Sequence, residues 1–392
     1  MTEPAAEPAP PGPPPTTLRE LAWLFAKLGF TAFGGPAGHV AMMEDEVVRR
    51  RRWLTHERFL DLLGATNLIP GPNSTEMAIH IGHDRAGWAG LGVAGVCFIL
   101  PAVAIVTAIA WAYVRFGALP AFAGALYGIK PVIIAVVVQA LWRLGKAAVK
   151  TPLLGVVGAA AAAANLVGVN ELIVLGACGV VVAGGRRGRA ACVAPWLPWP
   201  LLGASATGAG ATAVAAAFGL WPLFLLFLKV GSVLFGSGYV LLAFLRSDLV
   251  EHLRWLTESQ LLDAVAVGQV TPGPVFTTAT FIGYVLGGAP GAALATLGIF
   301  LPAFVFVALS GPLIPRLRRS KIAGAVLDGV NVGSLALMAV VALQLGRTAI
   351  VDAPTAVLAA ASAIALLWFR PNATWLVLAG AVLGAIIAWL GA

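Results

Sequence analysis

Residues 67–82, NLIPGPNSTEMAIHIG, combine a helix break with a run of polar side chains. Each proline fixes φ and lacks an N–H, so Pro70-Gly71-Pro72 must interrupt a helix there. Asn73 is placed to cap a new half-helix, and Glu76 three residues later completes a pair that resembles a capping box. The free N–H groups and the partial positive charge of such a terminus favour an anion.

Four further residues could do chemistry. Lys27 and Lys229 each lie inside an apolar run, FAKLGFTAFG and FLKVGSVLFG, and a cation inside a membrane segment is costly and points to function. Together they could neutralise a dianion, although each could instead snorkel to an interface. Glu76 and His80, four residues apart, share a helical face and are candidates for coupling to protons; a packing role for His80 is the alternative.

The elements that carry these residues occur twice. The pattern F-x-K-x-G-x-x-x-F-G, the motif RWLT and the tripeptide Pro-Gly-Pro all recur at an offset of 202 residues, the tripeptide as Pro272-Gly273-Pro274. The second copy places Thr277 and Thr278 after its break, and Thr277 aligns with Thr75. Duplication at a constant offset indicates two homologous repeats. Hydroxyl and amide groups facing each other across such a gap would suit a tetrahedral oxyanion.

Composition indicates an integral membrane protein, because 59% of the 392 residues are hydrophobic and 11% are charged, against about 25% in soluble domains. The net charge of +8 lies mainly in short loops, as expected from the positive-inside rule, so nucleic acid is not a predicted partner. The three cysteines share no metal-ligand spacing, and we predict neither a metal nor another cofactor.

In matching loops the basic excess falls in opposite copies; for example, residues 49–52 are RRRR and residues 251–254 are EHLR. The pattern predicts an all-α membrane fold of two inverted-topology repeats with discontinuous or re-entrant helices and roughly 10–13 membrane segments. The expected parts are a disordered tail (1–17), the first repeat (18–184), a basic linker with a candidate linking span (185–220) and the second repeat (221–392). In this architecture the substrate site lies where the repeats meet.

The motifs FxKxGxxxFGGP with His39, RRRRWL, LIPGPNSTEMAIHIG and the second TPGP resemble the chromate ion transporter family, in its long form with two fused domains. The resemblance implies chromate efflux by a multi-pass protein of the cytoplasmic membrane. It also points to Gly34, Gly35, Pro36, His39 and the Pro-Gly-Pro motif as site residues. The family commonly has Thr-Ser-Thr-Gln after Pro-Gly-Pro, whereas this chain has Asn-Ser-Thr-Glu.

The expected function is therefore secondary transport of a tetrahedral oxyanion by alternating access, most simply chromate efflux; a permease or channel for another anion such as sulfate is the alternative. No nucleotide-binding or hydrolase motif is found, so an enzyme is not expected. Predicted partners are the oxyanion, the bilayer, a coupling proton or counter-anion, and a second copy of the chain. The predicted substrate-binding residues are Lys27, Gly34, Gly35, Pro36, His39, Pro70, Gly71, Pro72, Asn73, Ser74, Thr75, Lys229, Gly236, Ser237, Pro272, Gly273, Pro274, Thr277 and Thr278.

Overall fold

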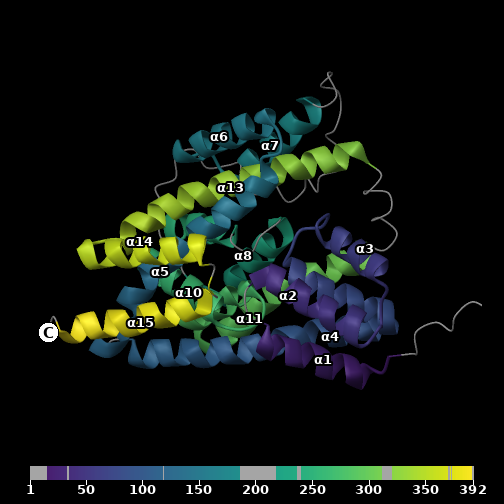
Figure 1. The fold of residues 1–392 in the computed structure, drawn as a ribbon, viewed down its shortest axis with the longest axis horizontal. Helices are drawn as coiled ribbons and strands as arrows, with labels where there is room; N and C mark the ends of the chain where they lie inside the picture. Colours follow the sequence, from purple (N-terminus) through teal and green to yellow (C-terminus); the bar gives the residue numbers. More distant parts are fainter. Residues whose placement is uncertain are drawn as a thin grey trace, which may run out of the picture.

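The computed structural model describes residues 16–32, 35–117, 119–185, 218–235, 240–310, 320–369, 371 and 373–390, and these residues form helices and connections without a strand. Residues 1–15 of the predicted tail and most of the predicted linker lie outside the described residues, while Thr17, also part of the predicted tail, caps the first helix. Four of the helices are long and apolar enough to cross a membrane. The predicted all-α membrane fold is confirmed (Figure 1).

The two repeats contain equivalent series of helices. The first repeat comprises α1 (Leu18–Thr31), α2 (Gly35–Glu44), the π-helix η1 (Asp45–Arg50), α3 (His56–Thr66), α4 (Asn73–Phe116), α5 (Pro120–Ala148), α6 (Pro152–Leu166) and α7 (Glu171–Gly185). The second comprises α8 (Leu220–Val233), α9 (Leu241–Leu245), the π-helix η4 (Arg246–His252), α10 (Glu258–Val270), the 3-10 turn η5 (Val275–Thr277), α11 (Thr278–Ser310), α13 (Lys321–Ala349), α14 (Ala353–Trp368) and α15 (Ala373–Leu390).

Both Pro-Gly-Pro motifs separate two helices, as the sequence predicted. The first part of α4, which follows the Pro-Gly-Pro break, is a half-helix. It ends where Ala86 and Gly87 leave helical geometry and the chain turns back on itself. Gly82 then packs against Gly90, where a side chain on either glycine would overlap the other's backbone. The same reversal occurs in α11 at Gly287 and Gly288. Each repeat thus presents a short half-helix followed by a longer apolar helix.

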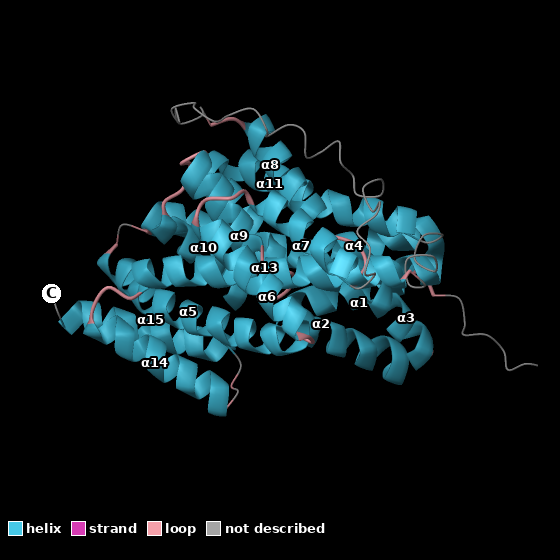
Figure 2. Ribbon diagram, turned by 90° about the horizontal axis from the view of Figure 1, so that it is seen from above, coloured by secondary structure: helices cyan, strands magenta, loops and turns pink. Residues whose placement is uncertain are grey.

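The helices form two groups, each drawn from both repeats. In the first group α4 packs on α1 and α11, and α11 packs on α8; in the second, α5 packs on α13, α14 and α15, and α13 packs on α6 and α7 (Figures 1 and 2). We call them the broken-helix bundle and the long-helix bundle. Helices α6 and α7 have 15 residues each, less than the roughly 20 that a helix needs to cross.

The bundles meet asymmetrically. Helix α10 packs against α5, α13 and α15 of the long-helix bundle, whereas its counterpart α3 packs mainly on α4. Leu262 of α10 is consequently 1% exposed and the equivalent Leu60 of α3 is 48% exposed. Two homologous repeats therefore adopt different packing in one structure.

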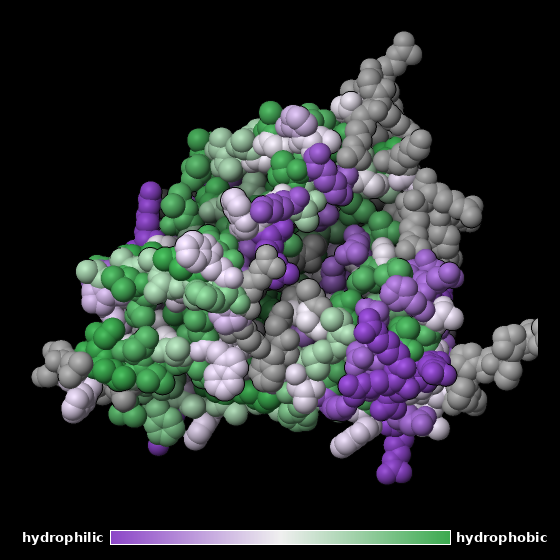
Figure 3. All heavy atoms as spheres, in the orientation of Figure 1, coloured by the Kyte–Doolittle hydropathy of each residue, from purple (hydrophilic) through white to green (hydrophobic). Residues whose placement is uncertain are grey.

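Polarity also differs between parts of the surface. Hydrophilic side chains gather on the side where α1 to α4 lie, and hydrophobic side chains cover the side of α14 and α15 (Figure 3). On the hydrophilic side, ion pairs such as Arg58–Asp84 and Arg50–Asp45 join α3 to α4 and stabilise η1. This is the kind of surface expected at a membrane–water boundary.

Candidate functional site

Each Pro-Gly-Pro turn lies at the interface between the repeats. The N–H of Gly71 donates to the carbonyl of Leu234 at 2.8 Å, and the N–H of Gly273 donates to the carbonyl of Ala32 at 3.0 Å. These are equivalent pairs, since 71 and 273, like 32 and 234, differ by 202. Each turn thus bonds to the end of the first helix of the other repeat. The exchange shows a twofold relation between the repeats at this point.

Glycine is required in both turns for conformational and steric reasons. Gly71 has a φ of +138° and Gly273 a φ of +89°, which side-chain-bearing residues rarely adopt. A Cβ on Gly71 would overlap the Glu76 carboxylate, and one on Gly273 would lie 2.7 Å from the Cβ of Ala102. Gly71 therefore lies close to the half-helix of its own repeat, and Gly273 lies close to α4 of the other repeat.

The half-helix of α4 begins at the predicted place but without the predicted cap. Pro72 is the N-cap residue and supplies no side-chain hydrogen bond, whereas the Asn73 amide donates to the side chain of Asn67 at 2.9 Å. The predicted pairing of Asn73 with Glu76 is therefore wrong, because the helix starts one residue earlier than that pairing needs. The terminus is left without a side-chain cap, which keeps backbone N–H groups available to a ligand.

The first two turns of this half-helix carry buried polar atoms that have no hydrogen-bond partner within the described part of the chain. They include the hydroxyl of Thr75, both carboxylate oxygens of Glu76 and Nε2 of His80. Thr75 and Glu76 are fully buried, and Ser74 beside them is 3% exposed. Buried polar groups are normally hydrogen-bonded, so unpartnered ones in a cluster call for a ligand, an ion or a proton.

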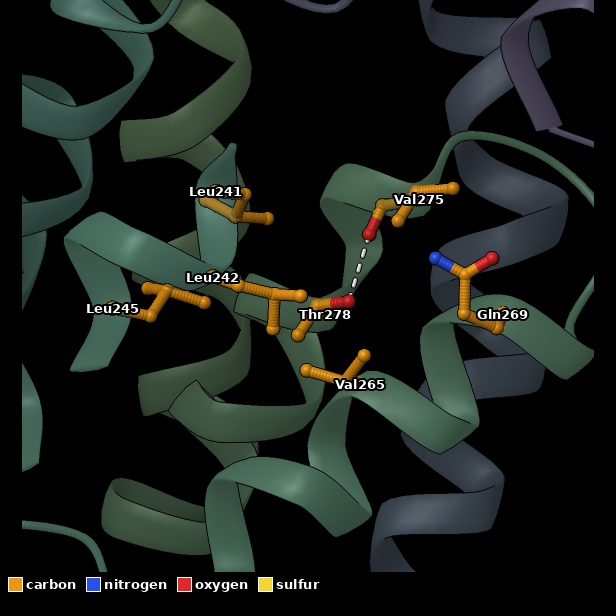
Figure 4. A pocket seen from close by; sticks show the side chains of 7 residues that line it. All are labelled: Leu241, Leu242, Leu245, Val265, Gln269, Val275 and Thr278. Carbon is orange, nitrogen blue, oxygen red and sulfur yellow. Dashed lines mark hydrogen bonds between the residues drawn. The ribbon is translucent and has the colours of Figure 1, made fainter. Parts of the chain in front are cut away.

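The second repeat presents a different set of atoms. The hydroxyl of Thr277 donates to the carbonyl of Pro274, and that of Thr278 donates to the carbonyl of Val275, both at 2.8 Å. Beside Thr278 lies a cavity with room for about one water molecule, lined mostly by leucine and valine side chains and by Gln269 (Figure 4). Both threonines are almost completely buried. Their hydroxyls are already hydrogen-bonded to nearby backbone carbonyls.

His39, which follows the first F-x-K-x-G-x-x-x-F-G motif, supports the bond between Gly273 and Ala32. His39 on α2 is buried and its Nε2 donates to the Ala32 carbonyl at 3.1 Å, the same oxygen that accepts from Gly273. Helix α2 begins at Gly35, which has a φ of +73°. Among the other predicted residues, Pro36 opens α2, and Gly34, Gly236 and Ser237 lie outside the described residues.

The two lysines are paired with acids that the sequence analysis overlooked. Nζ of Lys27 lies 2.8 Å from Glu46, and Nζ of Lys229 lies 2.7 Å from Asp248. The acids also differ by 202 in number, so the repeat alignment could have revealed them. The hydrogen bond from Lys27 keeps the pKa of Glu46, in η1, below its ordinary value. Neutralisation of an anion by the lysines remains a prediction, but their charges are already compensated here.

A second cluster joins the two bundles. Lys130 on α5 donates to the hydroxyl of Ser259 at 2.6 Å and lies 3.4 Å from Asp263, both on α10. The hydroxyl of Tyr113 on α4 donates to the other Asp263 oxygen at 2.9 Å. The equivalent Asp61 on α3 is exposed. The cluster therefore accompanies the asymmetric packing of α10 against the long-helix bundle.

Comparison with known proteins now identifies the group to which the chain belongs. The model of the family described as Chromate transporter matches residues 19–183 and 221–385. The chain belongs to the chromate transporter family. Each repeat is matched separately, and each contains one Pro-Gly-Pro turn and one Lys–acid pair. Within the part of the chain that the structure describes, no group of three metal-ligating side chains is found.

Several relatives resemble the chain over most of its length. It is 33% identical to the chromate transport protein of Cupriavidus metallidurans, covering 96% of this chain and 94% of that one. It is 32% identical to the chromate transport protein of Pseudomonas aeruginosa over 86% of this chain and 82% of that one. A probable chromate transport protein of Synechococcus elongatus is 30% identical over 87% and 88%. No solved structure matches.

Proposed function

We propose that this chromate transporter family member is a secondary transporter that carries chromate, or a similar tetrahedral oxyanion, out of the cell across the cytoplasmic membrane. The observation that carries the proposal is the exchange of hydrogen bonds between the two Pro-Gly-Pro turns and the opposite repeats. That exchange brings the uncapped N-terminus of the α4 half-helix to the repeat interface. Discontinuous helices that meet at such an interface form the substrate sites of many secondary transporters.

The residues of the site fit a tetrahedral anion. Backbone N–H groups at the start of α4 supply donors, and the positive end of the half-helix favours negative charge. The unpartnered hydroxyl of Thr75 adds a donor in the first turn. The relatives named chromate transport proteins support chromate as the first anion to test.

Burial of the site favours a carrier over an open channel. Ser74, Thr75 and Glu76 are at most 3% exposed, so an anion reaches them only after a rearrangement. The different packing of α3 and α10 supports alternating access, because exchanging the conformations of two homologous repeats would open the site to the other side. An inside-negative potential favours outward movement of a dianion by about 2.3 kcal/mol per charge for each 100 mV.

Counterflow in proteoliposomes tests the proposal. Vesicles loaded with unlabelled chromate should accumulate radioactive chromate transiently, and sulfate should compete if the site reads shape and charge. Flux that does not saturate, without counterflow, would indicate a channel instead. If sulfate or another oxyanion is carried and chromate is not, the protein is still a carrier, but its substrate is not chromate.

A further inference from the structure

The Glu76 side chain lies in the first turn of the α4 half-helix, beside the candidate site. It is fully buried, and neither carboxylate oxygen has a hydrogen-bond partner among the residues that the structure describes. The carboxylate lies against the backbone of Gly71, in the turn that bonds to the second repeat. An ionised carboxylate without a partner is heavily penalised in such a place. Either a proton or a ligand must complete the site.

Elements packed against α4 bring no free charge to this carboxylate among the described residues. Helix α11 and the turn η5 carry no acidic or basic side chain. The charged and titratable groups of the other packed elements are engaged elsewhere or lie on exposed helix faces: Arg19, Glu20, Lys27, His39, Glu44, His56, Glu57, Arg58, Asp61, Glu258 and Asp263.

We propose that Glu76 takes up one proton when the oxyanion binds, so that the anion and the proton cross together. This inference rests on the proposed anion transport and names its coupling ion. The proton comes from water on the side to which the site is open, forms an O–H bond on the carboxylate, and returns to water on the other side. No oxidant or further reactant is needed. A neutral Glu76 removes the repulsion that a carboxylate would exert on a dianion at the start of α4.

His80 provides the route for the proton. It lies one helical turn from Glu76, about 6 Å along the axis, and its buried Nε2 has no partner. The groups that face His80 are His83 and Asp84 on its own helix and Arg58 on α3. Arg58 and Asp84 form an ion pair at the surface. The stripe of Glu76, His80 and His83 therefore runs along the half-helix from the buried turn to its exposed end.

The coupling has a definite sign. Because protonation of Glu76 favours anion binding, anion binding must favour protonation by the same factor. Anion affinity should therefore fall as pH rises, by about tenfold per pH unit where Glu76 is ionised in the empty protein. Glu76→Gln imitates the neutral carboxyl in shape and charge. This variant should bind the anion with an affinity that does not vary with pH.

Proton uptake on anion binding tests the inference. Purified full-length protein in detergent micelles, in weakly buffered alkaline solution where chromate is a dianion, is titrated with chromate while a pH electrode records proton uptake. Equilibrium dialysis of the same samples gives the bound chromate. The wild type and the matched control Glu57→Gln, which alters an exposed carboxylate on α3, should take up about one proton per chromate. Glu76→Gln should take up none.

Each other outcome contradicts a definite part of the account. Chromate binding to the wild type without proton uptake would overturn the inference and leave the proposed function standing. Uptake that persists in Glu76→Gln would remove the role of Glu76. Failure of the wild type to bind chromate or sulfate would overturn both proposals. His80→Gln should keep the proton count and slow transport in proteoliposomes; an unchanged rate would remove the relay.

Discussion

At the scale of single residues, the two glycines of the Pro-Gly-Pro turns do the most to define the site. Gly71 and Gly273 have positive φ values and donate their N–H groups to the opposite repeat. Their hydrogen atoms allow contact with Glu76 and with Ala102, where any side chain would collide. The turns therefore act both as helix breaks and as the contact between repeats.

Gly71→Ala should lower both the melting temperature and chromate transport. The positive φ imposes strain of about 1–3 kcal/mol on alanine, and the new Cβ overlaps Glu76. Gly92→Ala is the matched control, because a Cβ at Gly92 meets no atom within 4 Å and alanine is favoured in a helix by about 0.8–1.0 kcal/mol. Equal melting temperatures and fluxes for Gly71→Ala and the wild type would show that the turn tolerates a side chain.

Thr75→Val should weaken anion binding more than Thr277→Val does. The hydroxyl of Thr75 has no partner in the described ranges of the chain, whereas that of Thr277 is already bonded to the Pro274 carbonyl. Loss of a hydrogen bond to a charged ligand costs about 1.5–3 kcal/mol, which corresponds to roughly a tenfold to a hundredfold or greater loss of affinity. Apparent affinities in vesicles would measure it, and an equal loss in both variants would contradict the different roles.

At the scale of helices, the sequence predicted the breaks but not the contacts between elements. Pro-Gly-Pro and the constant offset predicted the half-helices, because proline acts locally on the backbone. The predicted helix cap at Asn73 was wrong, because the residue at which a helix begins depends on the conformation of the whole preceding turn. The partners Glu46 and Asp248 were missed because the lysines were considered alone. The exchange of bonds between Gly71, Leu234 and their counterparts is long-range, and no local pattern encodes it.

Lys27→Met should destabilise the protein, because Glu46 loses the closest of its cationic partners. If the lysine is structural, adding Glu46→Gln should restore both the melting temperature and transport. If it also neutralises the anion, the double variant should melt normally and transport poorly. Thermal unfolding and vesicle uptake together distinguish the roles. A double variant that remains unstable but transports normally would contradict both accounts.

The same pair gives a pH dependence with a definite sign. The pKa of Glu46 is lowered in the folded protein by the hydrogen bond from Lys27. Its stabilisation is therefore present above the ordinary carboxyl pKa and is lost as pH falls through the lowered value. The difference in melting temperature between the wild type and Glu46→Gln should shrink on acidification. A difference that grows at low pH would contradict the assignment.

At the scale of the whole molecule, the two repeats have similar elements and different surroundings. Helix α10 is held against the long-helix bundle by the Lys130–Asp263 ion pair, while the equivalent Asp61 and the neighbouring Leu60 of α3 are exposed. Such asymmetry is what two homologous repeats need in order to alternate between two states. The sequence predicted the duplication, but it could not predict which repeat occupies which conformation.

Cysteine labelling tests the proposed alternation between two states. With the native cysteines replaced, Leu60→Cys should react with a thiol reagent in this state and Leu262→Cys should not, since these side chains are 48% and 1% exposed. Lys130→Met with Asp263→Asn removes the ion pair that joins α5 to α10 and should raise labelling at position 262 and lower it at position 60. Labelling that stays unchanged at both positions would mean that the asymmetry is fixed.

The location of bound chromate tests the central claim most directly. Anomalous scattering from chromium in crystals grown with chromate would place the anion without reference to the protein. The account predicts one peak between the two Pro-Gly-Pro turns, within hydrogen-bond reach of the first N–H groups of α4 and of the Thr75 hydroxyl. A peak elsewhere, with the space between the turns unoccupied, would show that the breaks are only structural and that the site lies in another part of the protein.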